Sequence, residues 1–497
     1  MPRQVTLQLS SFEDGLSKSV YQGGKKQFAP GTYDIDFTTD PGIIQPVIGM
    51  VRDLGDLGTR VIRAMIKASD GTYYWVGTNA STQLQVWTGG PGSSTTLTTS
   101  GSGNASFTNM LEGSKLVEFD GFLWFYASTT NLTKFNIGTP ALTTGQGTVT
   151  TSTSHGGDLL VYKSFLYYIN DNSVGRATNN TTFNNTALTL ETNRQITCLA
   201  PWFGKVIVGS VFQNEALNSR LTVWDGVSTL PDYHVEIPDN GISAIVNNEG
   251  VIYILCNSNP LGNARRNIIR IYAWAGGDKV QLVRELDLES TSSNLIRLVP
   301  SSVDVYKGKI YFTIDAGTAD TMNIDNGVYT LDRKGMLNLE YVDGGATEDT
   351  TDLAAFWCKW MDGELYWFYS DGTTNFRQHL PGITYSSNAR LDTLSLQFDP
   401  RYEARIDEIF FRTVSLPAST SVAVSISTDQ ASFSAVKTFD ADNATANLVT
   451  NQNDFAFQPG HTHQLRFAFT SSSASRVRVI LPIFIKATVF DSQTLTS

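Results

Sequence analysis

The sequence offers few residues whose types and spacing match an active site. Glycoside hydrolysis requires two carboxylates at a defined distance from each other. The chain has 47 Asp and Glu residues, but their positions in the sequence do not show which two lie at that distance. Asp70, Asp120 and Asp362 each precede a Gly and are better explained as turn residues. No nucleophile elbow, phosphate-binding loop or His-Glu-x-x-His zinc motif occurs. We therefore expect no catalytic residue, no metal and no cofactor.

Three short motif matches have simpler interpretations. GSGNAS, at Gly101, lacks the third Gly and the strand-to-helix context of a glycine-rich phosphate loop. SISTDQASF, from Ser425, is similar to a turn of sialidase-like folds, but Ala431 replaces the Gly of that turn, and the arginines of the chain are scattered, so we predict a plain turn. His461 and His463 would share one face of a strand; a metal site would need pairs from symmetric copies, so we predict surface histidines.

Four consecutive aromatics, Tyr366 to Tyr369, lie between two Asp-Gly pairs in DGELYWFYSDG. They would suit either a stacking platform for sugars or bases, or one buried strand between two turns. Similar stretches elsewhere favour the strand. We call each such stretch, a turn residue pair followed by an apolar or aromatic run, a kernel. The kernels are DGTYYWVG from Asp70, DGFLWFYA from Asp120, KSFLYYIN from Lys163, FGKVIVGS from Phe203, EGVIYILC from Glu249, KGKIYFTI from Lys307 and DGELYWFY from Asp362.

The second residue of each kernel is predicted to be the turn of a structural repeat. These residues are Gly71, Gly121, Ser164, Gly204, Gly250, Gly308 and Gly363, at spacings of 50, 43, 40, 46, 58 and 55 residues. Further strand candidates flank each kernel, so each repeat predicts an antiparallel meander. Such sheets must stack to bury both faces, which predicts a β-propeller of about seven blades, six or eight being possible. The alternative is an open row of sheets or a large sandwich.

The two ends of the chain lack the kernel. Residues 386–497 contain alternating strands, with Val422, Val424 and Ile426 on one buried face and Leu465, Phe467 and Phe469 on another, which predicts a β-sandwich. Residues 1–58 form an N-terminal arm, and the propeller is predicted to span 59–385. A propeller ring must be closed, and we expect part of the arm, or LDTLSLQF from Leu391, to supply the closing strand.

Composition limits the partners of the protein. A formal net charge of −11 argues against a protein that grips nucleic acid through its phosphates. No signal peptide or membrane-spanning stretch is evident, so we expect a soluble protein made in the cytoplasm, and Cys198, Cys256 and Cys358 are predicted to be reduced core thiols. The low-complexity segments 91–106 and 138–157 are predicted to be solvated loops, the alternative being adhesive loops that order against a partner.

The two ends together resemble a known class of protein. FEDGLSKSVYQGGKKQFAPGTYDIDFTTDPGIIQPVIGM resembles the opening of virion proteins of tailed bacteriophages, with Gly15 and Leu16, Pro30 and Gly31, Tyr33 to Asp36 and Pro41 to Pro46 as the matching parts. RYEARIDEIFFRTVSLPASTSVAVSISTDQASFSAV is similar to the sandwich that follows the propeller in phage tail proteins. None of these motifs is catalytic.

The resemblance implies a non-enzymatic structural protein of the virion. It would be a tail component such as a nozzle, a tail-tip or a fibre-attachment protein, present in several copies in a ring around the tail axis. Its partners would be other virion tail proteins: adaptor, tube or fibre. The alternative function is a host-surface glycan-binding or glycan-cleaving propeller, either a receptor-binding protein or a depolymerase.

Overall fold

The computed structural model of the protein describes every residue except 1, 18–25, 30, 41, 50, 53–60, 80, 91–97, 108, 112, 148, 152–156, 214–217, 259–265, 290–296, 316–326, 343–353, 371–374, 380–384, 387–388, 415, 441–446, 452–457, 473–474 and 491–497. Within these limits the chain forms strands and turns, one short 3-10 helix (Pro300–Ser302) and no α-helix, which confirms the predicted all-β class. No helix of the described residues is long and apolar enough to cross a membrane.

The chain divides into two compact units. The repeat unit comprises residues 52–322 and 349–379, and the terminal unit comprises residues 1–51, 323–348 and 380–497. The predicted boundaries at 58 and 385 lie a few residues from the divisions at 51/52 and 379/380, and the sequence did not predict that residues 323–348 group with the two ends. Gly15 pairs in parallel with Leu337, and Asn338 Nδ2 donates a hydrogen bond of 2.7 Å to the carbonyl of Ile35.

Five complete four-stranded antiparallel sheets follow one another in the repeat unit. They are β7 (Val61–Lys67), β8 (Tyr73–Thr78), β9 (Leu84–Thr88) and β10 (Thr98–Asn104); β11 (Val117–Phe119), β12 (Phe122–Ser128), β13 (Asn131–Asn136) and β14 (Ala141–Thr143); β15 (Leu159–Tyr162), β16 (Phe165–Asn170), β17 (Ser173–Ala177) and β18 (Phe183–Thr189); β19 (Arg194–Trp202), β20 (Lys205–Phe212), β21 (Ser219–Trp224) and β22 (Tyr233–Ile237); and β23 (Ile242–Asn248), β24 (Val251–Ser258), β25 (Arg266–Trp274) and β26 (Gln281–Glu289).

Two further sheets carry the last two kernels. One contains β27 (Arg297–Leu298), β28 (Asp304–Tyr306) and β29 (Lys309–Asp315); the other contains β32 (Ala354–Met361), β33 (Glu364–Ser370), β34 (Asn375–His379) and β6 (Val51–Arg52), in that order. β6 precedes the first repeat in sequence, yet it is the outermost strand of the sheet that holds the last kernel.

Each kernel forms a strand in the interior of its sheet, with hydrogen-bonded neighbours on both sides. β12 illustrates this, since β11 and β13 pair with it and its four central residues, Leu123 to Tyr126, have no exposed surface. A strand covered on both faces requires a continuous apolar run, and aromatic rings fill that space well. The turn into each of these strands has a positive φ at the repeat residue, for example 75° at Gly121 and 63° at Ser164.

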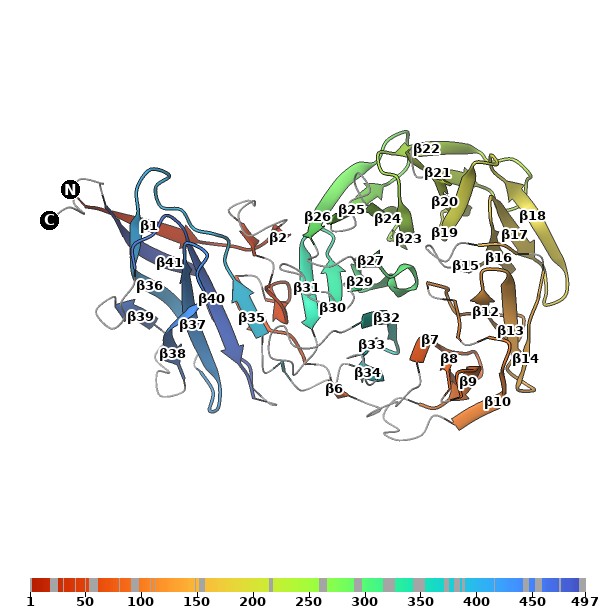
Figure 1. Ribbon diagram of the computed structural model, residues 1–497, viewed down its shortest axis with the longest axis horizontal. Coiled ribbons are helices and arrows are strands. Elements are labelled where there is room, and N and C mark those ends of the chain that lie inside the picture. The colour runs from red at the N-terminus through yellow and green to blue at the C-terminus, as the bar shows by residue number, and fades with distance from the viewer. Residues whose placement is uncertain are drawn as a thin grey trace. The chain divides into compact units, whose positions relative to one another are not determined.

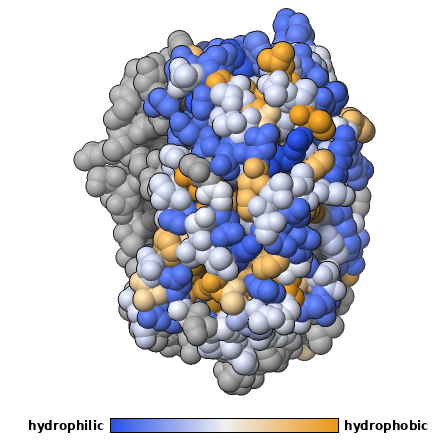
Figure 2. All heavy atoms as spheres, turned by 90° about the vertical axis from the view of Figure 1, so that its right-hand side faces the viewer, coloured by the Kyte–Doolittle hydropathy of each residue, from blue (hydrophilic) through white to orange (hydrophobic). Residues whose placement is uncertain are grey.

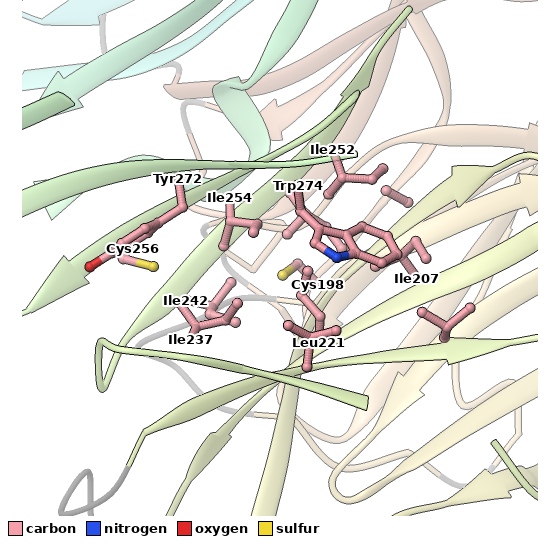
Figure 3. Close-up of a cluster of buried hydrophobic side chains, with 14 of the residues drawn as sticks. Cys198, Ile207, Leu221, Ile237, Ile242, Ile252, Ile254, Cys256, Tyr272 and Trp274 are labelled. Carbon is pink, nitrogen blue, oxygen red and sulfur yellow. The ribbon is translucent and has the colours of Figure 1, made fainter. Parts of the chain in front are cut away.

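The sheets of the repeat unit lie around a common centre, with β7, β15, β19 and β23 inside and β14, β18, β22 and β26 outside (Figure 1). Figure 3 shows how two neighbours pack: Ile207 and Leu221 of β20 and β21 meet Ile252 and Trp274 of β24 and β25 in one buried cluster. Sheets stacked radially in this way form a β-propeller.

The last and first sheets of this ring also pack together. Trp75 of β8 makes edge-to-face contacts with Tyr366 and Phe368 of β33, at ring-centroid distances of 6.4 and 5.6 Å. Ile62, Met65 and Trp357 complete the same buried cluster. An open row of sheets has no such contact, so this alternative is wrong.

The low-complexity segments are not only loops. Residues 98–104 form β10, which pairs with β9, and residues 141–143 form β14, which pairs with β13. Thr and Ser suit an edge strand because they tolerate a pleated, half-solvated surface.

Figure 2 shows the side of the ring on which β14 and β18 lie in Figure 1. The described surface on that side is mainly hydrophilic, with small separate apolar spots.

The terminal unit contains strands from distant parts of the chain. One sheet has the order β39 (Asn447–Asn451), β36 (Ala404–Thr413), β41 (Val479–Val489), β5 (Ile43–Pro46) and β4 (Ile35–Asp36), with β1 (Arg3–Leu9) also paired to β41. A second has the order β35 (Ala389–Asp392), β40 (His463–Thr470), β37 (Ser421–Thr428) and β38 (Ser434–Phe439). A third run comprises β30 (Gly327–Leu331), β31 (Leu337–Val342), β2 (Gly15–Leu16) and β3 (Gln27–Phe28).

The predicted alternation in the C-terminal strands is confirmed by burial. Val422, Val424 and Ile426 are buried on β37, and Leu465, Phe467 and Phe469 are buried on β40. The first two sheets contact each other through these faces, because Phe411 of β36 packs edge-on against Phe439 and Phe467, each at a centroid distance of 5.6 Å.

Candidate functional site

Two carboxylates near the centre of the ring join neighbouring sheets. Asp158, just before β15, accepts hydrogen bonds of 2.8 Å from the backbone N–H of Leu159 and, in the next sheet, of Leu199. Asp304, at the start of β28, accepts bonds of 2.9 Å from the N–H of Val305 and of Trp360, which lies on the first strand of the following sheet. Carboxylates bound by backbone donors in this way are structural.

A cavity of roughly 220 Å³ lies between the inner strands of four sheets, and we call it the central cavity. Two lysines line it. Lys115 forms an ion pair of 2.9 Å with Asp158, whereas the ammonium group of Lys359 makes no hydrogen bond or ion pair with any described residue. The other lining residues are Ala64, Met65, Leu116, Val117, Ser301, Val303, Asp304, Trp357 and Cys358.

Burial shifts the pKa values of Asp304 and Lys359, which line the central cavity, in opposite directions. It raises the pKa of Asp304 above its usual value, against the opposing field of Lys359. It lowers the pKa of Lys359, an effect that Asp304 opposes and Lys115 reinforces. Both shifts favour the neutral form, so the environment is a poor one for an unpaired charge.

The aspartates before the kernel glycines are turn residues with additional contacts. Asp70 accepts hydrogen bonds from Thr72 N–H (2.8 Å) and the Tyr74 hydroxyl (3.0 Å), within its own sheet. Asp120 binds the backbone and side-chain nitrogens of Asn180 in the next sheet. Asp362 pairs with Lys67 at 2.6 Å and accepts a hydrogen bond from Tyr73, so it joins the last sheet to the first.

The consecutive aromatics of the last kernel are core residues. Tyr366, Trp367 and Phe368 have exposed fractions of 0%, 0% and 1%, which confirms the buried strand and excludes a stacking platform for these three rings. The side chain of Tyr369 lies outside the described residues. The motif at Gly101 is part of β10, where an added Cβ would lie 2.9 Å from the carbonyl oxygen of Pro140.

The prediction that both histidines are surface residues is wrong for His463. β40 begins at His463, and His461 lies in the bend before it, so the two imidazoles do not share a face. His461 is exposed, but His463 is 1% exposed and contacts the carbonyl of Ala404 through Nε2 at 2.8 Å and the hydroxyl of Thr428 through Nδ1 at 3.1 Å. Burial lowers the pKa of His463.

The turn predicted at SISTDQASF is confirmed. Asp429 and Gln430 connect β37 to β38 with φ of 47° and 67°. Burial acts to raise the pKa of Asp429, but hydrogen bonds from Thr462 and His461 outweigh it, and the pKa lies below its usual value.

The cysteines are buried, and burial raises the thiol pKa of each, to about 12 for Cys198. Within the described residues no group of three or more His, Cys, Asp or Glu side chains is placed to bind a metal ion.

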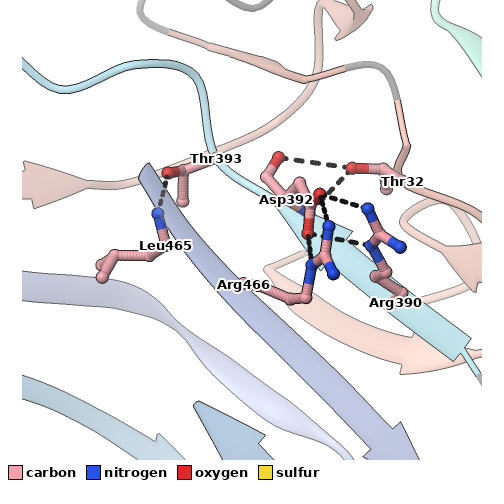
Figure 4. Close-up of polar contacts among 6 residues, drawn as sticks. All are labelled: Thr32, Arg390, Asp392, Thr393, Leu465 and Arg466. Carbon is pink, nitrogen blue, oxygen red and sulfur yellow. Dashed lines mark hydrogen bonds and ion pairs between the residues drawn. The ribbon is translucent and has the colours of Figure 1, made fainter. Parts of the chain in front are cut away.

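In the terminal unit, a buried charge cluster ties the N-terminal segment to the C-terminal strands. Asp392, whose side chain is 2% exposed, binds Arg390 at 2.8 Å and Arg466 at 3.0 Å (Figure 4). The hydroxyl of Thr32 accepts a hydrogen bond of 2.9 Å from the N–H of Asp392, and Tyr33 and Arg390 exchange backbone hydrogen bonds of 3.0 Å. Thr32 and Tyr33 lie within the N-terminal segment that spans residues 12–50.

Among the residues that the structure describes, most of the exposed large apolar side chains gather at one end of two adjacent sheets. Phe203, in the turn between β19 and β20, is 75% exposed, and Leu230 and Val227, in the β21–β22 loop, are 73% and 58% exposed. Tyr233 and Leu282 extend this apolar end, and Trp202 packs on Trp274 beneath it at a centroid distance of 4.5 Å. In an antiparallel meander the first turn and the third turn lie at the same end of the sheet.

Sequence reasoning missed Lys115, Asp158, Asp304 and Lys359. The signal for Lys359 is a single cation inside the apolar run FWCKWM, and for Asp304 a single anion inside VDVY. A charge embedded in an apolar strand is rarely tolerated without a partner, which marks such a position for attention.

No protein-family model matches the chain, and no curated protein sequence matches it. Solved structures are similar to it at the level of the fold. The propeller domain of the Trilobed protease from Pyrococcus furiosus has 10% identity and a TM-score of 0.35, with 67% of this chain and 91% of that chain covered. An exo-β-1,3-galactanase from Phanerochaete chrysosporium has 8% identity and a TM-score of 0.31, covering 77% and 97%. The N-terminal domain of Nup159 has 9% identity and a TM-score of 0.42, covering 70% and 98%. Likenesses this distant carry no information on ligand or activity.

Proposed function

We propose that the protein is a structural component of the tail of a tailed-bacteriophage virion, that it acts through contacts with other tail proteins, and that it is not an enzyme. The observation that carries the proposal is the joining of the two phage-like ends. β5, within the first of these segments, pairs with β41 at Ile43 and Ile44, and β41 pairs in turn with β36, which lies within the second segment. The segments on which the resemblance rests thus belong to one folded unit.

The proposal includes a finer architecture than the one described above. The repeat unit would be a seven-bladed propeller with one kernel at each repeat turn, Gly71, Gly121, Ser164, Gly204, Gly250, Gly308 and Gly363. The N-terminal arm would close it through β6, which is the outermost strand beside β34. The contacts of Phe411 between the two C-terminal sheets favour a β-sandwich.

Two further observations support a structural role over glycan cleavage. Asp158 and Asp304, near the central cavity, are each held by two backbone N–H groups, one of them from the neighbouring sheet, which gives both carboxylates a structural role in the ring. The apolar end around Phe203 and Leu230 is the kind of exposed surface that marks contacts between proteins.

The direct test is to locate the chain in particles. Phage particles produced from the genome that encodes this chain should contain it in several copies by quantitative mass spectrometry, and gold-labelled antibodies should mark the tail. In parallel, the purified chain should neither bind a glycan array nor release sugars from host polysaccharide. Particles that lack the chain, or specific glycan binding or cleavage, would overturn the proposal in favour of a glycan-directed propeller.

The copies are expected to assemble on a partner. We predict that the purified chain is monomeric or weakly associating in light scattering and forms a ring only on a preassembled tail protein. A stable ring formed by the purified chain alone would contradict this prediction.

A further inference from the structure

We propose that the central cavity binds a small oxyanion, a carboxylate or an inorganic phosphate, with Lys359 as its principal donor. The site is separate from the contacts invoked for the tail function, so either proposal can fail without the other.

Lys359 lies on an inner wall of the ring with an ammonium group that no described residue binds. Its strand β32 is the innermost of its sheet, and the residues before it, Trp357 and Cys358, are buried at 3% and 1% exposure. An ammonium group carries three N–H donors and no acceptor. Within the described residues none of these donors has a hydrogen-bond acceptor or an ion-pair partner, so all three are available to a ligand in the cavity that Lys359 lines.

The groups around that ammonium leave its charge without a contacting anion. Lys115 lines the same cavity, so two like charges converge there, and only Lys115 has a close anion, at 2.9 Å from Asp158. The carboxylates do not neutralise Lys359 at contact distance. Asp158 is occupied by Lys115 and two N–H groups, and Asp304 by two N–H groups.

The size of the central cavity suits a small oxyanion. A cavity of roughly 220 Å³ holds on the order of seven waters at about 30 Å³ each, which is enough for a phosphate or a short carboxylate and its hydration. A planar or tetrahedral oxyanion would accept from Lys359 and relieve the repulsion between the two ammonium groups. Ser301, Val303, Ala64 and Val117 also line the cavity, and its volume limits the ligand to a small one.

The pH dependence follows from the charged groups that line the cavity, which are Lys115, Asp304 and Lys359, and from Asp158, which pairs with Lys115. Because burial raises the pKa of Asp304 and lowers that of Lys359, acidification neutralises the aspartate and charges the lysine. Both changes make the cavity more positive. Affinity for a monovalent carboxylate is therefore expected to rise as the pH falls from alkaline values, until the ligand itself is protonated.

The test is isothermal titration calorimetry of the full chain with phosphate, sulfate, acetate and succinate, with chloride at matched ionic strength as the reference. Lys359→Met keeps the length of the side chain and removes the charge, and it should weaken binding roughly ten-fold or more. Lys307→Met is the matched control, because Lys307 is exposed in the turn after β28, and its affinity should equal that of the native chain.

Each result has a defined meaning. Selective binding of phosphate or of the carboxylates, lost in Lys359→Met and kept in Lys307→Met, supports the site and identifies the preferred oxyanion. Circular dichroism establishes that the variant is folded, and Lys359→Gln replaces it if Lys359→Met is not. No binding of any oxyanion up to 10-millimolar concentrations (on the order of the weakest useful affinity), binding equal to that of chloride, or binding unchanged in folded Lys359 variants would overturn the proposal.

Discussion

The repeat unit and the terminal unit are both built from β-sheets, but different forces stabilise their contacts. In the repeat unit, neighbouring sheets meet through apolar clusters, such as the one that contains Tyr167, Val208 and Trp224. In the terminal unit, segments far apart in the chain meet partly through charge, since Asp392 pairs with Arg466 at 3.0 Å and Asp40 pairs with Arg478 at 2.8 Å. Charged groups also join sheets of the repeat unit, as Lys67 and Asp362 do, but there they supplement apolar clusters, whereas joining distant ends requires contacts that also specify register.

The largest expected effect is the loss of an apolar contact between sheets. Trp224 is fully buried and its ring lies edge-on to Tyr167 of the preceding sheet, at a centroid distance of 5.7 Å. Trp224→Ala should lower the free energy of unfolding by about 3–5 kcal/mol, because it leaves a cavity. Urea denaturation followed by tryptophan fluorescence measures this. Val227→Ala, in the exposed loop nearby, is the control and should change stability by less than about 0.5 kcal/mol.

Removing the central carboxylate of the terminal unit should have the next largest effect. Asp392→Asn leaves Arg390 and Arg466 without their shared anion in a mostly buried place, which should cost about 3 kcal/mol. Glu408→Gln removes an exposed ion pair with Lys486 and should cost less than about 1 kcal/mol. Thermal unfolding of both variants measures the difference. Equal losses would show that buried charge is not what distinguishes the terminal unit.

The repeat turns should be sensitive to backbone conformation and not to crowding. At Gly121 φ is 75° and an added Cβ would meet nothing within 4 Å, so Gly121→Ala should cost about 1 kcal/mol from backbone strain alone. At Gly175 the added Cβ would lie 2.1 Å from the ring of Tyr168, and overpacking should cost about 1–3 kcal/mol. Chemical denaturation ranks the two. A larger loss at Gly121 would refute this account of the turns.

The smallest expected effect is the titration of His463. Its folded pKa lies below its ordinary value, so the unfolded chain takes up the proton first as the pH falls. The stability that neutral His463 contributes is complete above pH about 6.5 and is lost as the pH falls through the folded pKa. The free energy of unfolding lost is about 1.4 kcal/mol for each pKa unit by which the folded value lies below the unfolded one. His463→Gln should reduce the slope of stability against pH between about 6.5 and 5, and His461→Gln, at the exposed neighbour, should not. Equal slopes for all three chains would contradict this prediction.

The repeats could be predicted from sequence because their signals are local. A Gly or a residue that tolerates positive φ, followed by a buried apolar run, specifies a turn and a strand within one repeat. The closing contact of Trp75 with Phe368, the grouping of residues 323–348 with the ends and the burial of His463 depend on residues far apart in the chain. No local pattern encodes them.

The candidate site was unpredictable for the same reason. Lys359 and Lys115 are separated by more than two hundred positions, and only the ring brings them to one cavity. The edge strands β10 and β14 were mistaken for loops because Ser, Thr and Gly are as common in loops as they are at a solvated sheet edge.

The contact between the last and first sheets has a consequence for the time course of folding. Within each complete sheet, consecutive strands pair, so it can form soon after its own residues leave the ribosome. Lys67 and Asp362 are 295 residues apart, and neither they nor the cluster around Trp75 can meet until the last kernel has been synthesised. Until then the first sheet exposes an apolar flank. We therefore expect ring closure to be the slow step of folding, and the nascent chain to be most prone to aggregation just before it.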